Sequence, residues 1–133
     1  MNSLVNISEG AFLAFHGLAY MAQQTPQRVS VKKLAEVLQA SEAHLAKVFQ
    51  KLSKAELVNS VRGPAGGFTL NRAPEEINFL EILETIESKV RLNGCPFGKV
   101  NCAFKTCIFN TELNRISQEI YNTFKNMKLS EFS

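Results

Sequence analysis

The fold of this chain is decided by the stretch Leu57-Val58-Asn59-Ser60-Val61-Arg62-Gly63-Pro64-Ala65-Gly66-Gly67-Phe68, which continues as Thr69-Leu70-Asn71-Arg72. Both ends of the stretch are short runs of alternating side chains, and the residues that join them are rich in glycine and proline. This pattern predicts a β hairpin with an arginine at the end of each strand. A glycine-rich loop can also cradle a nucleotide phosphate, but no strand-to-helix junction or Gly-Lys-Ser/Thr sequence accompanies this one. We therefore exclude a nucleotide site.

Two short amphipathic helices are expected immediately before the hairpin. Ser30 and Ser41 are both suited to cap a helix N-terminus, and apolar residues follow each of them at helical spacing. These residues are Val31, Leu34, Ala35 and Leu38 in the first helix, and Leu45, Val48, Phe49 and Leu52 in the second. Two helices joined by a short turn form a helix-turn-helix, and a hairpin directly after them is the wing of a winged helix. The predicted fold class is mainly α with a small β hairpin.

Three further helices are expected around this unit. Residues 8–22 carry Phe12, Phe15, Leu18, Ala19 and Ala22 at helical intervals behind a Ser8 cap. Asn78 and Glu81 resemble a capping box for a helix with the apolar face Phe79, Ile82, Leu83 and Ile86. The last helix, over residues 108–129, has an apolar stripe of Phe109, Leu113, Ile116, Ile120, Phe124 and Met127. Such a seam favours pairing with a second copy of the chain, while part of it can also pack on its own domain.

Positive charge is concentrated in the helix-turn-helix and the hairpin. The formal net charge is only +3, yet residues 28–72 hold eight Lys or Arg against three Asp or Glu. The outer face of the second helix of the motif is polar and basic, with Ala43, Lys47, Gln50 and Lys54. A winged helix with a basic face indicates binding to nucleic acid.

All three cysteines, Cys95, Cys102 and Cys107, lie in one short stretch that also contains Gly94, Pro96 and Gly98. An odd number of clustered thiols does not form an ordinary disulfide framework. Thiolates are soft ligands that suit zinc, copper(I) or an iron-sulfur cluster, so we interpret the stretch as a soft-metal or iron-sulfur site. The absence of Cys-x-x-Cys spacing argues against a structural zinc site. The alternative is that the thiols simply pack as small apolar side chains.

Other classes of protein fit the sequence less well. No stretch is apolar over the length of a membrane span, and the N-terminus lacks the regions of a signal peptide, so we expect a cytoplasmic protein with no membrane partner. No Ser/His/Asp or Cys/His arrangement suggests nucleophilic catalysis, and we predict no enzyme activity. His16 lies in an apolar helical stretch and is interpreted as a packed or partner-bonded side chain and not as a ligand.

From about Ile7 to its C-terminus, the chain resembles the IscR and NsrR family of bacterial winged-helix transcription regulators. The wing sequence carries most of the resemblance, together with Pro74-Glu75-Glu76-Ile77 and the three clustered cysteines. The resemblance implies that Cys95, Cys102 and Cys107 bind a 2Fe-2S or 4Fe-4S cluster whose state governs DNA binding. It also implies that Arg62, which matches the family's wing arginine, enters the minor groove of A-T-rich DNA.

The sequence departs from the family pattern in two places. Six and four residues separate the successive cysteines, whereas five is common in the family, and Asn110 stands where IscR-like members have a histidine ligand. In NsrR-like relatives a carboxylate at the start of the first helix, donated by the other subunit, serves as a cluster ligand. The residue at the matching position of this sequence is Glu9. The fourth ligand implied by the resemblance is therefore Glu9. The alternative is that Glu9 is only a first-turn carboxylate favoured by the helix dipole.

The sequence thus predicts a homodimeric repressor that binds palindromic double-stranded operator DNA. Residues 1–133 would form one domain, with a DNA-reading part at about 8–74, a helix and cysteine loop at 78–107 and a dimerisation helix at 108–129. The expected DNA contacts are Arg28, Ser30, Lys32, Ala43, His44, Lys47, Gln50, Arg62, Gly66 and Gly67. Two alternatives remain. One is a cluster-free repressor that senses thiol oxidation, a metal or a metabolite, and the other is a winged helix that only binds proteins.

Overall fold

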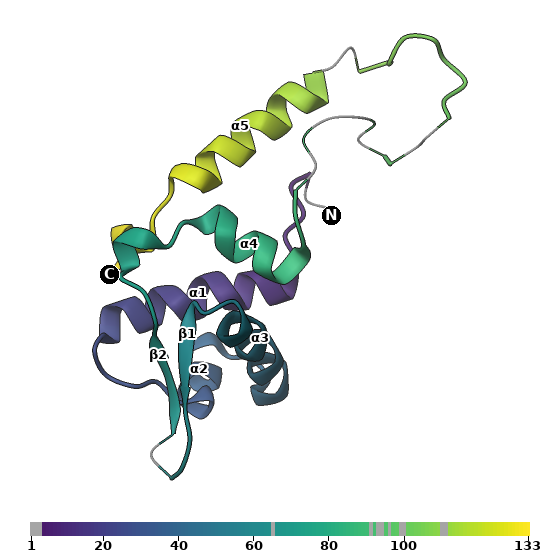
Figure 1. Cartoon of the computed structure of the whole chain (residues 1–133). Coiled ribbons are helices and arrows are strands. Elements are labelled where there is room, and N and C mark those ends of the chain that lie inside the picture. The colour runs from purple at the N-terminus through teal and green to yellow at the C-terminus, as the bar shows by residue number, and fades with distance from the viewer. Residues whose placement is uncertain are drawn as a thin grey trace.

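The computed structural model describes residues 4–64, 66–90, 92, 95, 97–98, 101–109 and 112–133. Within them the element order is α1 (Glu9–Gln24), α2 (Val31–Leu38), α3 (Glu42–Lys54), β1 (Val58–Val61), β2 (Gly67–Leu70), η1 (Pro74–Glu76), α4 (Phe79–Glu87), α5 (Glu112–Asn126) and η2 (Leu129–Phe132). The β1–β2 hairpin and the α2–α3 pair lie at one end of the molecule, and α5 lies on the opposite side of α1 and α4 (Figure 1). The predicted class, mainly α with a small hairpin, is confirmed.

The helix-turn-helix forms as its capping residues and apolar stripes predicted. The Ser30 hydroxyl accepts a hydrogen bond from the Lys33 backbone N–H at 3.0 Å, and the Ser41 hydroxyl accepts one from the His44 backbone N–H at 3.3 Å. These bonds satisfy amide groups that would otherwise lack partners at the start of a helix. The apolar stripe of α3 is buried in full, with Leu45, Val48, Phe49 and Leu52 in the core. The recognition helix is therefore held by one face, and its other face is left to solvent.

The hairpin is held to the helical body by a third piece of extended chain. β1 and β2 pair antiparallel, with Val58 opposite Leu70 and Val61 opposite Gly67. Val29, just before α2, forms an isolated bridge with Phe68 through two backbone hydrogen bonds of 3.0 and 2.9 Å. The wing is consequently anchored part-way along β2 to the segment that enters the helix-turn-helix.

Helix α1 packs across the other helices, and most of its predicted apolar residues are buried. Phe15 stacks on Phe79 of α4 at a centroid distance of 5.1 Å and meets the edge of Phe124 of α5 at 5.9 Å. Phe12 differs from the prediction, because its side chain is 45% exposed and stacks on the exposed His16 ring. Both residues lie on the outer face of α1, so His16 is not packed in the core, but its Nδ1 lies 2.8 Å from the Phe12 carbonyl oxygen, which confirms the partner-bonded form of the interpretation. Periodicity alone places a residue in a helix but does not say how wide the buried face is.

The predicted capping box at the start of α4 forms only in part. The Asn78 side chain accepts a hydrogen bond from the Glu81 backbone N–H at 2.8 Å, as expected. The Glu81 carboxylate instead binds Arg72. A cation from the end of the wing has taken the partner that a reciprocal capping box would use.

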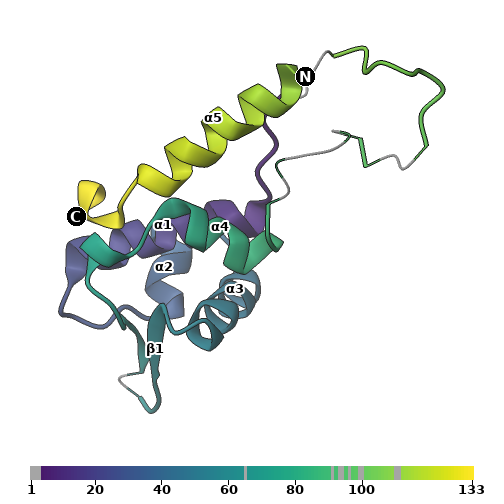
Figure 2. The same cartoon turned by 45° about the horizontal axis from the view of Figure 1, so that its top comes forward.

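Helix α5 begins later than expected and touches the body mainly through its C-terminal end. It starts at Glu112 instead of about residue 108, because Phe109 packs against the Phe97 ring at 5.6 Å and lies outside the helix. None of its residues is fully buried, and Ile116 is 41% exposed. Both views show the N-terminal half of α5 standing clear of the other helices (Figure 2). Among the described residues, no helix is both long enough and apolar enough to cross a membrane.

Candidate nucleic-acid interface and cysteine stretch

The outer face of α3 is exposed along its length. Ala43, Lys47 and Gln50 are all solvent-exposed, and they lie opposite the buried stripe that fixes the helix. The wing extends from the same end of the molecule (Figure 1). This arrangement presents a basic helix and a hairpin at the same end of the molecule. A winged helix needs this geometry to contact two grooves of DNA.

The tip of the wing presents Arg62 to solvent. Arg62 follows β1 directly and is exposed, and the Gly66 N–H closes a turn by donating to the Gly63 carbonyl at 2.9 Å. Gly66 and Gly67 have tight surroundings inside the wing as well. A Cβ on Gly66 would lie 2.6 Å from the Val61 carbonyl oxygen, and one on Gly67 would lie 2.5 Å from the Val29 carbonyl oxygen. Both glycines are therefore required by the wing itself, whatever they contact in a complex.

A polar hollow separates the wing from the start of α2. It has a volume of about 430 Å³ and contains the predicted contacts Arg28 and Ser30. The other lining residues are Tyr20, Gln24, Gln27, Val29, Lys33, Pro64 and Gly66. Of the predicted contacts near α2, Arg28 and Lys32 are exposed. Sequence reasoning missed Lys33 and Tyr20 as members of this surface, because they are brought to the wing by the Val29–Phe68 bridge and not by their own helical pattern.

His44 lies on a different side of α3 from the other predicted contacts. It is half-buried, and its Nε2 lies 3.9 Å from the position that a Cβ on Gly10 of α1 would take. Ile86 of α4 approaches the same point to within 3.3 Å. The imidazole therefore faces the junction of α1, α3 and α4, and a DNA contact by this residue stays a prediction.

Arg72, at the far end of the hairpin, is occupied within the protein. Its guanidinium donates to both Glu81 carboxylate oxygens, at 2.5 and 3.0 Å, and to the Glu76 carbonyl at 2.6 Å. The hydrogen bonds with Glu81 raise the pKa of Arg72 above its ordinary value. The arginine predicted at this strand end is engaged within the protein, because a bidentate carboxylate lies within reach.

The cysteine stretch projects from the body as an extended segment (Figure 1). Cys102 and Cys107 are exposed free thiols, and Cys95 is half-buried. The contact between the Phe97 and Phe109 rings brings together the chain next to the first and the last cysteine. Within the described parts of the chain, no three His, Cys, Asp or Glu side chains are grouped so that they could hold a metal ion. Asn110 lies outside the described residues.

The candidate ligand Glu9 lies where the cysteine stretch leaves the helical body. It is the exposed first residue of α1. The preceding residue, Ser8, donates to Oε2 of Glu87 from its backbone N–H at 3.0 Å and from its hydroxyl at 2.7 Å. Glu87 is the last residue of α4, so the start of α1 is tied to the exit towards the cysteines. Ser88 follows with a φ of 77°, a conformation that is strained for a residue other than glycine.

Comparison with known proteins identifies the family. A family model described as Rrf2, iron-dependent transcriptional regulator, matches residues 7–133. The chain belongs to the Rrf2 family. This is a family of transcriptional regulators and not of enzymes, in agreement with the prediction, and the resemblance to IscR and NsrR is confirmed by named relatives.

The relatives of this Rrf2 chain include regulators of both named types. The NsrR regulator of Shouchella clausii is 36% identical over 94 residues, which are 70% of this chain and 60% of that protein. The IscR regulator of Aliivibrio salmonicida is 33% identical over 122 residues, which are 91% of this chain and 71% of that protein. Among solved structures, CymR, the global cysteine regulator of B. subtilis, has a TM-score of 0.77 at 23% identity and covers 96% of this chain and 95% of its own. At that identity the likeness to CymR shows the fold alone.

Proposed function

We propose that this Rrf2 protein is a homodimeric repressor that binds a palindromic operator, with α3 in the major groove and the wing beside the minor groove. The observation that carries the proposal is the exposure of Lys47 and Gln50 on α3 together with Arg62 on the wing, at one end of the molecule. Side chains of this kind reach base edges and phosphates when a recognition helix docks. Arg28, Ser30 and Lys32 would meet the backbone beside α2.

Dimerisation is proposed through the apolar stripe of α5. No residue of α5 is fully buried: Ile116 is exposed and Leu113 and Ile120 are half-buried, while Phe124 packs on the body. An exposed apolar seam of this spacing is stabilised when a second helix covers it. A twofold dimer would place two identical readers on the two half-sites of a palindrome.

Control by an iron-sulfur cluster is proposed for the cysteine stretch. Three thiolates on one projecting segment fit the cluster by donor type, and the Phe97–Phe109 contact supports closure of that segment. Cys95, Cys102 and Cys107 of one subunit would hold the cluster, with Glu9 of the partner subunit as the fourth ligand. When bound, the cluster would supply a centre that reacts with oxidants or nitric oxide and whose occupancy follows the iron supply. The Ser8–Glu87 contact keeps the start of α1 at the base of the segment.

Anaerobic purification tests the cluster proposal. The protein is expected to be coloured, with visible absorption and with iron and sulfide in a fixed ratio to the chain. If the protein is colourless after purification and attempted cluster reconstitution, the cluster proposal is refuted and the DNA-binding proposal is unaffected.

Thiol oxidation is the second candidate for the signal, and the exposure of Cys102 and Cys107 favours it. Both thiols are accessible to an oxidant, and oxidation to a disulfide would remove two electrons and two protons from the pair. Mass measurement after oxidant treatment, with and without reductant, distinguishes the two candidates. A cluster-free protein that gains a reducible disulfide and loses operator affinity would be a thiol sensor.

Salt titration of DNA binding tests the proposal against a role in protein interaction only. A protein that neutralises phosphates must lose affinity steeply as salt rises. A folded dimer that retains no DNA, even at low salt, would support the interaction module instead.

A further inference from the structure

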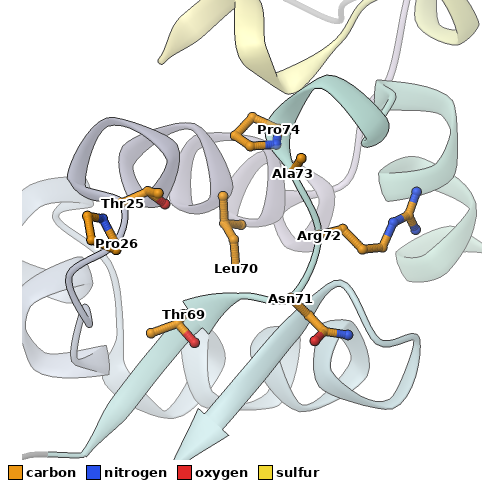
Figure 3. A pocket seen from close by; sticks show the side chains of 8 residues that line it. All are labelled: Thr25, Pro26, Thr69, Leu70, Asn71, Arg72, Ala73 and Pro74. Atoms are coloured by element: carbon orange, nitrogen blue, oxygen red, sulfur yellow. The ribbon is translucent and has the colours of Figure 1, made fainter.

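The base of the wing and the end of α5 are attached to the same turn of α4. On the wing side, the attachment is Arg72, two residues beyond the end of β2. Its guanidinium forms a bidentate pair with Glu81, in the first turn of α4, and also donates to the Glu76 carbonyl just before that helix. Figure 3 shows the Arg72 side chain directed away from Leu70 and Thr25 and towards α4. Arg72 is also one of the residues that line the neighbouring hollow, which has a volume of about 470 Å³.

On the α5 side, the attachment consists of backbone hydrogen bonds between the chain that follows α5 and the start of α4. The Phe79 N–H donates to the Met127 carbonyl at 3.0 Å, and the Leu129 N–H donates to the Ile77 carbonyl at 2.9 Å. Ile77 and Leu129 are both fully buried. These bonds give the end of α5 a fixed place relative to α4, even though the rest of that helix stands clear of the body.

Arg72 is poorly available for DNA, although its charge and position in the sequence suggest such a contact. A phosphate would have to compete with a carboxylate that already engages the guanidinium through two parallel hydrogen bonds, the strongest pairing that an arginine makes with an acid. Lysine cannot reproduce that fork geometry. The residue is therefore better suited to hold two parts of the protein together than to hold a ligand.

We propose that Arg72 is a positioning residue which, through Glu81 and the first turn of α4, fixes the wing relative to the dimerisation helix and so sets the half-site spacing that the dimer accepts. This inference rests on the proposed function, because it needs a dimer formed through α5 and a wing that contacts DNA. The mechanical reason is that both attachments end within a few residues of Phe79. If the Arg72–Glu81 pair is lost, the wing keeps its bridge to Val29 and its covalent connection to α4, but it loses the side-chain attachment to the first turn of that helix.

Operators of altered spacing test the proposal. An operator is first selected from random DNA with the full-length protein, and derivatives are then made with one base pair added or removed at its centre. Each base pair shifts the half-sites by about 3.4 Å and rotates them by about 35°. We expect the affinity of the unaltered protein to fall about tenfold or more on the derivatives, because the DNA must be deformed to restore the register.

Two variants and one control separate positioning from charge. Arg72→Lys keeps the charge and Glu81→Gln removes a negative charge, so a purely electrostatic role predicts unchanged affinity for the first variant and higher affinity for the second. The positioning role predicts the same effect for both variants. The spacing discrimination, which is the affinity for the selected operator divided by that for a derivative of altered spacing, should fall from about tenfold to about threefold or less. A threefold ratio is less than half of a tenfold ratio on a logarithmic scale. Arg28→Ala is the matched control. It should lower affinity on all operators alike, with a salt slope smaller by about one.

The outcomes separate the inference from the proposed function. Folded, dimeric Arg72→Lys and Glu81→Gln proteins that keep the full spacing discrimination would overturn the inference and leave the DNA-binding dimer intact. If only one variant folds, its discrimination decides in the same way, and circular dichroism and sedimentation establish which variants qualify. If the unaltered protein selects no operator or sediments as a monomer, the proposed function fails and the inference fails with it.

Discussion

Replacement of Gly67 by alanine should displace the wing from the segment that precedes α2. Gly67 has a φ of 148°, and a Cβ at this position would lie 2.5 Å from the Val29 carbonyl oxygen and 2.9 Å from its carbon. These neighbours are backbone atoms that already take part in the bridge to Phe68, so they cannot move aside as a flexible side chain would. The substitution must therefore lengthen the two hydrogen bonds between Val29 and Phe68, which now measure 3.0 and 2.9 Å.

The cost has two parts. An alanine held at positive φ is strained by about 1 to 2 kcal/mol. Weakening two backbone hydrogen bonds adds about 1 to 2 kcal/mol, since each contributes about 0.5 to 1.5 kcal/mol net. We expect the free energy of unfolding of Gly67→Ala to fall by about 2 to 4 kcal/mol, a large share of the ~5 to 15 kcal/mol typical of a domain.

Gly63→Ala is the matched control, because it lies in the same wing at a φ of 101° and its Cβ would meet nothing within 4 Å. Only the strain applies there, about 1 to 2 kcal/mol, and the loss of unfolded-state freedom is the same in both variants. Urea unfolding followed by circular dichroism gives both values, and gel retardation gives the operator affinities. If the two variants agree in stability to within about 0.5 kcal/mol, the close approach to Val29 is not the reason for glycine at position 67.

Three further predictions concern DNA binding, assembly and the signal. Arg62→Ala should weaken operator binding by about 1 to 3 kcal/mol if the side chain reads a base, and unchanged retardation with folding intact would contradict the placement of the wing. The double substitution Ile116→Glu with Ile120→Glu should bury unpaired charge in the subunit interface and yield monomers in sedimentation, with operator affinity collapsing; a persistent dimer would show that the principal interface lies elsewhere. Replacing any one cysteine with serine should abolish or greatly reduce cluster absorption, whereas Glu9→Ala should leave a more fragile cluster with a shifted spectrum, and an unaltered spectrum would remove Glu9 alone from the ligand set.

The DNA-reading part could be predicted from the sequence because its signals are local. A capping serine followed by a short amphipathic pattern fixes a helix within one or two turns, and Ser30 and Ser41 both act in this way. The alternation on either side of a glycine-rich turn fixes the hairpin and its register in the same manner. The resemblance to the family was carried by this part together with residues 74–77 and the clustering of the three cysteines.

The remaining features depend on partners that are distant in the sequence. The partner of Arg72 could not be predicted, because nothing local in the sequence indicates that the Glu81 carboxylate is turned towards it. Phe109 fitted the helical stripe of α5 by spacing, but it packs against Phe97 across the cysteine stretch. His44 shares its helix with Lys47, yet its ring faces α1. In each case tertiary contacts override a correct local pattern, and the arrangement of the three thiols around a cluster depends on a second subunit that one sequence does not place.

The hydrogen bond between Phe79 and Met127 also bears on how the sensing segment can evolve. The chain leaves the body at the end of α4, passes through the cysteine stretch and α5, and returns to the start of α4, so the whole excursion has both ends pinned to one helix. Lengthening such a loop costs little chain entropy, about 0.6 kcal/mol for each doubling of its length. We therefore expect insertions and deletions between the cysteines to leave the positions of α3 and the wing undisturbed.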